Sequence, residues 1–225
     1  MPTIAANEVH LYQLDLDDSD SIIADLQDQL LSAVEKEKAN RFVQEIHRVR
    51  YQRGRSWMRT ILAEYVDISA SELEIQEQTR GKPFLEKYPI EFNLSHSENQ
   101  AVLAVTREQA VGIDIERFAR LVELEALSEI HFLESERKWL ANYSGREKQQ
   151  AFFWIWTAKE ARMKITGEGF ALPSKNIEVS FEADLPVAYQ LPTDHSVYLT
   201  TLVDVVSESA CCLASTTPEQ QVVFK

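Results

Sequence analysis

Hydrophobic and polar residues alternate along several short stretches of this chain and repeat at helical spacing along others. Alternation places side chains i and i+2 on the same face of a strand. Together with short apolar runs, it predicts strands at residues 9–16, 73–76, 90–94, 101–106, 111–116, 177–181, 197–205 and 211–215. Apolar residues three and four positions apart predict helices at residues 22–31, 48–65, 134–141 and 149–165. This mixture predicts an α/β (α+β) fold.

The two halves of the chain repeat the same order of elements. In the first half, a capping box at Ser32–Glu35 begins a short helix that extends to about Gln44. The helix at 134–141 takes the same place in the second half. In both halves a longer helix and then an acid-flanked strand follow the short helix. A preserved order of this kind predicts duplication of a unit of roughly 100 residues.

Individual residues agree with this duplication. A shift of about 99 residues places Glu37 on Glu136 and Trp57 on Trp156. We therefore expect an N-terminal subdomain at residues 1–110 and a C-terminal subdomain at residues 111–225. Because clefts between domains are favoured ligand sites, the active site is expected at their interface.

The charge of the chain limits what it can bind. Hydrophobic residues make up 44% of the 225 residues and charged residues 26%, as in ordinary globular proteins. The net charge of −13 disfavours nucleic acid as a partner. Six arginines nevertheless lie within residues 41–59, a segment with only one acid, Glu45. This basic island, residues 41–59, indicates either a local anion site or a solvated helix face.

Cysteine usage and the terminal segment predict the compartment. Cys211 and Cys212 are neighbours in a predicted strand and therefore face opposite sides of a sheet. They predict two buried thiols in a reducing compartment rather than a disulfide or a metal pair. The N-terminus lacks the basic and apolar pattern of a signal peptide. The longest apolar run, Ala151–Trp156, is too short for a membrane span. The expected location is the cytoplasm, without membrane contact.

The segment Val111–Glu116 carries the first candidate chemistry. Its alternation places Asp114 and Glu116 on one face of a strand, while Ile113 and Ile115 point into a core. Two carboxylates on one face are suited to a hard divalent cation. The same alternation is also typical of the solvent face of an amphipathic edge strand.

A helix supplies the second half of this candidate site. Trp156, Glu160 and Lys164 are four residues apart and therefore lie on one stripe of the helix at 149–165. Glu160 would add a third carboxylate for Mg²⁺ or Mn²⁺, and Lys164 is suited to phosphate. Glu–Lys spacing of this kind is also typical of surface ion pairs. The many aromatic residues of this helix indicate that it is largely buried, where charge needs a partner.

Two further motifs complete an ordered set. Asn93-Leu-Ser-His-Ser97 follows a predicted strand, where site residues collect, and Arg80-Gly-Lys-Pro83 predicts a turn. With Gly-Lys-Pro, Asn-Leu-Ser-His-Ser, Gly-Ile-Asp-Ile-Glu and Trp-Thr-Ala-Lys-Glu-Ala in this order, the chain resembles the 4′-phosphopantetheinyl transferases. The motifs and length are similar to the monomeric Sfp-type branch. The resemblance spans about residues 35–181.

The resemblance implies both a fold and an activity. The implied fold has two similar subdomains related by a pseudo-twofold axis, each a small, mainly antiparallel sheet packed on helices. The implied enzyme transfers the 4′-phosphopantetheine group of coenzyme A to a serine of an apo acyl or peptidyl carrier protein. This reaction depends on Mg²⁺, with Mn²⁺ as an alternative ion, and releases adenosine 3′,5′-bisphosphate. The resemblance also implies a monomer.

The same resemblance assigns roles to individual residues. Asp114, Glu116 and Glu160 correspond to the metal ligands. Glu160, Lys164 and His96 correspond to the catalytic residues. Glu160 is the candidate base for the serine hydroxyl, directly or through a metal-bound water, and a water coordinated at Glu116 is the alternative. The implied coenzyme A contacts are Lys38, Arg50, Lys82, Pro83, Ser95, His96, Lys159 and Lys164.

Carrier docking and two alternative functions complete the expectations. Carrier proteins are usually acidic, as this chain is, so docking is expected on a local apolar patch. The candidate segment is residues 121–132, with Leu124 and Phe132. One alternative function is a metal-dependent nuclease, which the net charge of −13 opposes. The other is a nucleotide- or carrier-binding module without catalysis, which the intact acidic set opposes.

Overall fold

The computed structural model describes residues 2–18, 29–120, 122–167, 172–182, 185–190, 197–203, 205–218 and 220–225. Its first sheet contains, in order, β11 (Gln221–Phe224), β1 (Glu8–Asp15), β5 (Gln100–Arg107) and β4 (Ile90–Ser97). Its second sheet contains β6 (Val111–Arg117), β10 (Ser209–Ser215) and β9 (Tyr198–Thr201). Two short pairs are β2 (Gln76–Glu77) with β3 (Pro83–Phe84) and β7 (Glu178–Glu182) with β8 (Leu185–Gln190).

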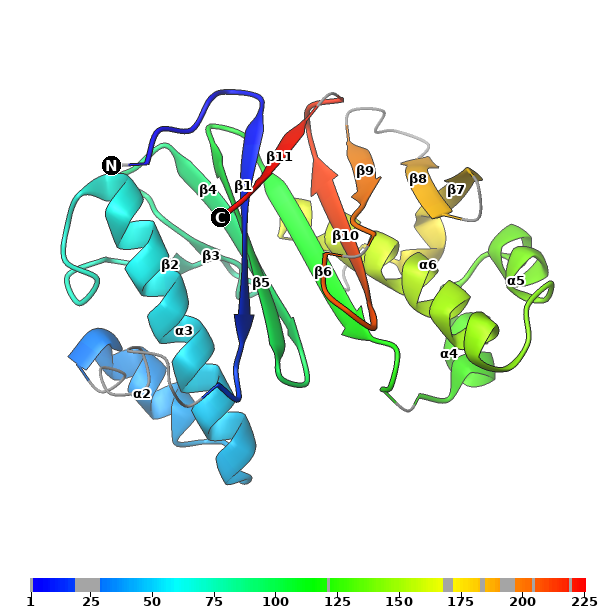
Figure 1. The fold of residues 1–225 in the computed structure, drawn as a ribbon, viewed down its shortest axis with the longest axis horizontal. Helices are drawn as coiled ribbons and strands as arrows, with labels where there is room; N and C mark the ends of the chain where they lie inside the picture. The colour runs from blue at the N-terminus through cyan, green and yellow to red at the C-terminus, as the bar shows by residue number, and fades with distance from the viewer. Residues whose placement is uncertain are drawn as a thin grey trace.

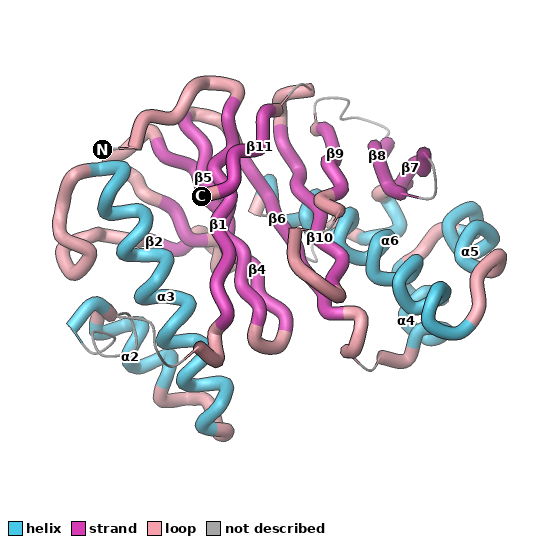
Figure 2. The backbone as a smooth tube through the Cα atoms, in the orientation of Figure 1, coloured by secondary structure: helices cyan, strands magenta, loops and turns pink. Residues whose placement is uncertain are grey.

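Each sheet packs against one long helix that is preceded by a short one. The first half contains α2 (Ala33–Ala39) and α3 (Glu45–Val66). The second half contains α4 (Leu124–His131), α5 (Glu134–Leu140) and α6 (Gly145–Thr166). Figure 1 shows the strands across the middle of the molecule, with α2 and α3 at one end and α4 to α6 at the other. Figure 2 shows the same separation of strands and helices along the backbone. The predicted α/β fold with two similar halves is confirmed.

The core explains why these helices lie on these sheets. Met58 and Leu62 of α3 are buried with Phe92 and Leu103 of the first sheet. On α6, residues such as Phe152 and Ile155 are buried with the alternate residues of β10 that face the helix. Strand periodicity on one side and helix periodicity on the other therefore meet in two separate apolar layers.

A buried charged pair repeats in both halves. Glu35 of α2 and Glu136 of α5 hold the same helix position, and each accepts a hydrogen bond from the N-cap backbone amide. Glu35 pairs with Arg59 of α3 at 2.7 Å, and Glu136 pairs with Lys159 of α6 at 2.8 Å. When the two halves are compared, Glu35 of α2 is therefore equivalent to Glu136 of α5. The predicted match of Glu37 with Glu136 is wrong, because scattered identities do not define which helix positions are equivalent.

The remaining differences concern the lengths of predicted elements and four elements that were not predicted, the helix α4 and the strands β3, β8 and β11. The short helix that was expected to reach Gln44 ends at Ala39, and β4 continues to Ser97, so the Asn93–Ser97 motif is itself strand. The strand predicted at 73–76 is reduced to β2. Residues 22–28 of the predicted helix at 22–31 lie outside the described residues.

The last strand of the chain returns to the first sheet. β11 pairs in parallel with β1, with Val222 opposite Val9.

Cys211 and Cys212 of β10 are free, buried thiols, as predicted. Among the described residues, no helix combines the length and the apolar character that a membrane span needs.

Candidate functional site

Side chains of β4 join this strand to β6 where the two sheets meet. Asn93, Ser95 and Ser97 lie on one face of β4, because strand residues two apart face the same side. Each accepts a hydrogen bond from a backbone amide of β6. The bonds join Ile113 N–H to Asn93 Oδ1 (2.7 Å), Ile115 N–H to Ser95 Oγ (3.4 Å) and Arg117 N–H to Ser97 Oγ (3.1 Å). These side chains replace the backbone ladder that joins strands within a sheet.

The two acidic residues of β6 are buried together, as their alternation predicts. Ile113 and Ile115 lie in an apolar cluster on one face of the strand. Asp114 and Glu116 lie on the other face and are only 5% and 8% exposed. The alternative of a solvent-facing edge strand is therefore wrong, because both edges of β6 are covered, by β10 and by the polar side chains of β4.

Neighbouring hydroxyl and ammonium groups orient both carboxylates. Asp114 Oδ1 accepts hydrogen bonds from Ser95 Oγ at 2.9 Å and from Lys164 Nζ at 2.6 Å. Glu116 Oε2 accepts a hydrogen bond from Ser97 Oγ at 2.6 Å. In this structure the Ser95 hydroxyl therefore bonds to a carboxylate of the protein. Lys164 Nζ lies 2.9 Å from the same hydroxyl oxygen.

Helix α6 brings the third carboxylate to the same place. A Cβ atom at Gly112 would lie 2.1 Å from the Ala161 carbonyl oxygen, so the glycine allows the helix backbone to rest directly on β6. The predicted stripe of Trp156, Glu160 and Lys164 then faces the strand. Together these elements enclose the carboxylate pocket, a cavity of about 320 Å³ lined by Leu94, Ser95, His96, Asp114, Glu116, Arg120, Trp156, Glu160 and Lys164.

The acidic side chains that line the carboxylate pocket outnumber the lysine and arginine side chains. Burial and the charges of Asp114 and Glu116 together raise the pKa of Glu160 to about 7, whereas the charge of Lys164 opposes the shift. Burial also raises the pKa of Asp114, against the effect of Lys164. Three carboxylates with only Lys164 and Arg120 among them form an electrostatic environment that favours a bound cation.

The donor set fits a divalent metal ion. Among the described residues, Asp114 Oδ2 has no hydrogen-bond partner although it is buried, which is costly unless a ligand satisfies it. Within the described part of the chain, no three acidic, histidine or cysteine side chains are grouped closely enough to ligate one ion as they stand. Lys164 pairs with Asp114, and Arg120 pairs with Glu116. A bound cation would therefore replace these two ion pairs with direct ligation.

A second cavity adjoins the carboxylate pocket and includes the basic island. This basic pocket has a volume of about 340 Å³ and is lined by Leu16, Phe42, His47, Arg50, Tyr51, His96, Ser97, Glu98, Glu116 and Arg120. His96 is exposed between the two cavities and lines both. Desolvation lowers the pKa of His96, and the positive charge of Lys164 lowers it further. The pocket combines cationic and aromatic side chains, which suits a phosphorylated nucleoside.

Arg50 and Lys38 differ in how the structure places them. Arg50 lines the basic pocket, where its guanidinium donates two hydrogen bonds to Asp17, at 2.8 and 2.5 Å. Lys38 is half exposed and pairs with Glu77 at 3.3 Å. It lies 6.0 Å from the ring centre of Tyr51, beside the pocket rather than in its lining.

The turn at Gly81-Lys82-Pro83 lies beside the end of α6. Lys82 and Pro83 line a third cavity of about 210 Å³, together with Lys164 and Gly167. Lys82 is 9% exposed, and its ammonium donates to two backbone carbonyls, those of Val111 at 3.1 Å and Ile165 at 2.9 Å. The ammonium group of Lys82 therefore makes its hydrogen bonds to the protein backbone.

Lys159 does not lie in any of these pockets, and its expected contact with coenzyme A is wrong. The side chain is 2% exposed and pairs with Glu136. Its Nζ also donates to the carbonyl oxygens of Ser174 and Ile177, at 2.9 and 2.6 Å. Helical periodicity explains the error, because the next residue, Glu160, points about 100° away around α6 and faces the carboxylates.

Arg120 belongs to the site but was not among the predicted residues. It lines both the carboxylate pocket and the basic pocket and pairs with Glu116. Ser97 was part of a quoted motif without a role of its own. Its position two residues after Ser95 could have indicated a shared strand face, whereas Arg120 follows β6 in a turn and had no such signal.

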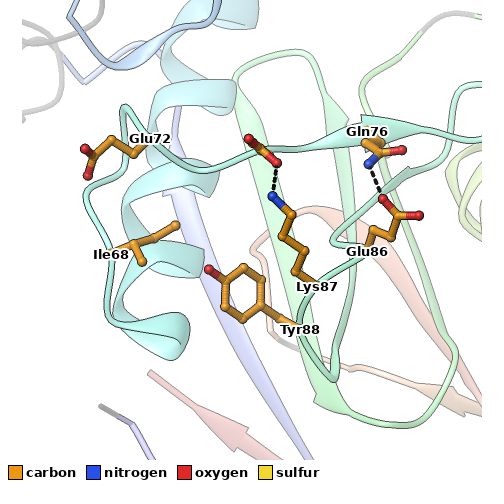
Figure 3. A pocket seen from close by; sticks show the side chains of 7 residues that line it. Ile68, Glu72, Gln76, Glu86, Lys87 and Tyr88 are labelled. Atoms are coloured by element: carbon orange, nitrogen blue, oxygen red, sulfur yellow. Dashed lines mark hydrogen bonds and ion pairs between the residues drawn. The ribbon is translucent and has the colours of Figure 1, made fainter.

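A fourth cavity lies in the first half and is independent of these pockets. It measures about 270 Å³ and is lined by Ile68, Glu72, Glu74, Gln76, Glu86, Lys87 and Tyr88. Several of its polar groups bond to one another. Lys87 donates to Glu74, and Gln76 donates to Glu86, as Figure 3 shows. Its polar groups therefore form no convergent set of free donors or acceptors like that of the carboxylate pocket.

Two family models match consecutive parts of the chain. The model described as 4′-phosphopantetheinyl transferase superfamily matches residues 110–214. The model described as 4′-phosphopantetheinyl transferase, N-terminal, matches residues 24–108. The matched segments include β6 and α6 in the first case and α3 and β4 in the second.

Two curated relatives match most of the chain, and one solved structure matches about half of it. The 4′-phosphopantetheinyl transferase HetI of a Nostoc species is 35% identical over 94% of this chain and 88% of its own. The 4′-phosphopantetheinyl transferase Sfp of Bacillus subtilis is 29% identical over 82% of each chain. A crystal structure of a holo-(acyl-carrier-protein) synthase from Bacillus anthracis with coenzyme A covers 47% of this chain and 93% of its own, with a TM-score of 0.41 and 25% identity.

Proposed function

Because this chain belongs to the 4′-phosphopantetheinyl transferase family, we propose that the carboxylate pocket and the basic pocket together form its active site. The chain is an enzyme that transfers the phosphopantetheine group of coenzyme A to carrier proteins. The nuclease and the binding module without catalysis are therefore set aside. The observation that carries the proposed site is the convergence of Asp114, Glu116, Glu160 and Lys164 in one pocket.

We assign the metal ion to the three carboxylates. Asp114, Glu116 and Glu160 would hold Mg²⁺, or Mn²⁺, since the orphaned Asp114 Oδ2 and the raised pKa of Glu160 both favour a cation there. When bound, the ion would supply Lewis-acid stabilisation to the pyrophosphate oxygens. The hydroxyls of Ser95 and Ser97 hold two of these carboxylates in place.

The basic side chains would bind the phosphates of coenzyme A. Arg50 and His96 line the basic pocket, and Lys164 lies at the carboxylate pocket beside it. Binding of a phosphate to Arg50 would displace Asp17. Because phosphoryl transfer depends mainly on charge neutralisation and alignment, cations on both sides of the pyrophosphate can supply most of the catalysis.

A carboxylate of the same pocket would take the proton of the carrier serine. A general base must lie within reach of the proton that it accepts, and Glu160 lines the same pocket as Asp114 and Lys164. We therefore assign the acceptance of the serine hydroxyl proton to a carboxylate oxygen of Glu160. The product other than the holo carrier protein would be adenosine 3′,5′-bisphosphate.

Incubation with coenzyme A, Mg²⁺ and an apo carrier protein tests the assignment. The wild-type chain should convert the carrier to its holo form, detected by mass spectrometry, and removal of Mg²⁺ with a chelator should stop the conversion. Asp114→Ala and Glu160→Ala should abolish transfer while circular dichroism remains native. Near-wild-type conversion by either folded variant would refute the proposed site.

Carrier docking requires a revised surface. Phe132 is completely buried in the core of the second half, so its expected role in docking is wrong. Ile130 of α4 is 62% exposed, next to the same core. We propose that Ile130 contacts the carrier protein, and Ile130→Glu should raise KM for the carrier while KM for coenzyme A stays constant. We also propose that the chain acts as a cytoplasmic monomer.

A further inference from the structure

The ammonium of Lys82 connects the two elements that carry the proposed active site. Its two acceptors are the carbonyl of Val111, the first residue of β6, and the carbonyl of Ile165, near the end of α6. The same strand carries Asp114 and Glu116, and the same helix carries Glu160 and Lys164. Lys82 itself comes from a different part of the chain, the turn between β2 and β3.

The end of α6 depends on this contact. The last carbonyl groups of a helix have no partner within the helix, and a positive charge there is favourable. Lys82 supplies both a donor and a charge to the Ile165 carbonyl. The helix ends at Gly167, whose φ of 71° is in the left-handed region. A Cβ atom at Gly167 would lie 2.2 Å from Gln78 Oε1 and 3.4 Å from Lys82 Cδ, so the turn packs directly on the helix end.

The packing of α6 on β6 leaves little freedom between them. A Cβ atom at Gly112 would lie 2.1 Å from the Ala161 carbonyl oxygen and 2.7 Å from the Ile165 backbone nitrogen. Ile165 therefore contacts the start of β6 through its backbone and Lys82 through its carbonyl. A change at Lys82 would act on the same turn of α6 that carries Lys164.

We propose that Lys82 is a positioning residue that holds the end of α6 against the start of β6. In this role it sets Glu160 and Lys164 relative to Asp114 and Glu116, and its ammonium does not bind coenzyme A. The inference rests on the active site proposed above. It differs from the sequence expectation, in which Lys82 contacts coenzyme A.

Steady-state kinetics with Lys82→Met separates the two roles. Methionine keeps most of the side-chain volume but removes the donor to both carbonyls. A displacement of about 1 Å between α6 and β6 should lower kcat on the order of 10²-fold, while KM for coenzyme A should change by less than about twofold. A rise in KM of tenfold or more with an unchanged kcat would show a direct contact with coenzyme A and overturn the proposal.

Lys87→Met is the matched control. Lys87 follows the turn in the sequence, is 63% exposed and pairs with Glu74 at 2.5 Å. Its kcat and KM should equal those of the wild type. A fall of kcat in this variant similar to that of Lys82→Met would also overturn the proposal, because the effect would not depend on the buried contacts.

A second variant and a reference variant complete the test. If circular dichroism shows that Lys82→Met does not fold, Gly167→Ala decides. Alanine is strained at the φ of 71° that ends α6, so this change would shift the helix end against the turn while Lys82 keeps its ammonium. A lower kcat at constant KM supports the proposal, and an unchanged kcat refutes it. Asp114→Asn, measured in parallel, should be inactive. If it were active, the proposed active site would fail independently of Lys82.

Discussion

The raised pKa of Glu160 predicts that the active site destabilises the protein when no metal ion is bound. The pKa rises from 4.5 to about 7 on folding, because the carboxyl is buried beside Asp114 and Glu116. A carboxyl with a raised pKa in the folded state stabilises the fold only while it is protonated. This contribution is complete below the unfolded pKa and is lost as pH increases through the folded pKa. Glu160→Gln, which mimics the protonated form, removes the loss.

The magnitude follows from the shift. At about 1.4 kcal/mol per pKa unit, the ionised Glu160 costs about 3 kcal/mol at pH 8. Glu160→Gln should therefore raise the free energy of unfolding of the metal-free protein by about 3 kcal/mol at pH 8, and by less than about 1 kcal/mol at pH 5. The variant should be inactive at both pH values. Comparison at each pH cancels the titration of groups that both proteins share.

Urea denaturation in the presence of a chelator, followed by circular dichroism at pH 5 and pH 8, measures this difference. Glu147→Gln, an exposed change on the same helix, is the control and should stay within about 0.5 kcal/mol of the wild type. Mg²⁺ should stabilise the wild type more than Glu160→Gln, because the variant lacks one ligand. Equal stability of wild type and Glu160→Gln at pH 8, or a gain of the same size at both pH values, would refute the reasoning.

Three further predictions concern other parts of the site. Lys159→Met leaves the fully buried Glu136 without its ion-pair partner and should lower the free energy of unfolding by about 3–5 kcal/mol. KM for coenzyme A should not change, because Lys159 lies outside the pockets. Gly112→Ala places a methyl group against the helix backbone and should cost about 1–3 kcal/mol in urea denaturation, whereas Gly54→Ala, where the nearest atom is 3.5 Å away, should not destabilise. Arg50→Ala should raise KM for coenzyme A about tenfold, through loss of a charge-assisted hydrogen bond; an unchanged KM would contradict its assignment.

Local periodicity was sufficient for the residues that lie in one element. Asp114 and Glu116 share a face because they are two apart in a strand, and Trp156, Glu160 and Lys164 share a stripe because they are four apart in a helix. These relations hold wherever the elements are placed. The predicted relations are therefore also present in the folded protein, and the predicted carboxylate set lies in one pocket.

Residues whose partners come from other elements were not predictable in this way. Lys82 and Lys159 are lysines in motifs, and both direct their ammonium groups to backbone carbonyls far along the chain. Phe132 was expected at the surface but is buried, because α5 and α6 close over it. In each case the direction of the side chain depends on which element packs against it, and an isolated segment does not contain that information.

The sequence by itself determined most of the elements, though not α4, β3, β8 or β11. It also determined their duplicated order, the acidic strand face and the acidic helix stripe, since all of these depend on periods of two and 3.6 residues. Only the tertiary structure decided that β4 joins β6 through Asn93, Ser95 and Ser97. It also decided that Gly112 lets α6 rest on the strand and that Lys82 connects the two. The physical reason is that hydrogen bonds and steric contacts between distant segments exist only after packing has brought their atoms within a few ångströms.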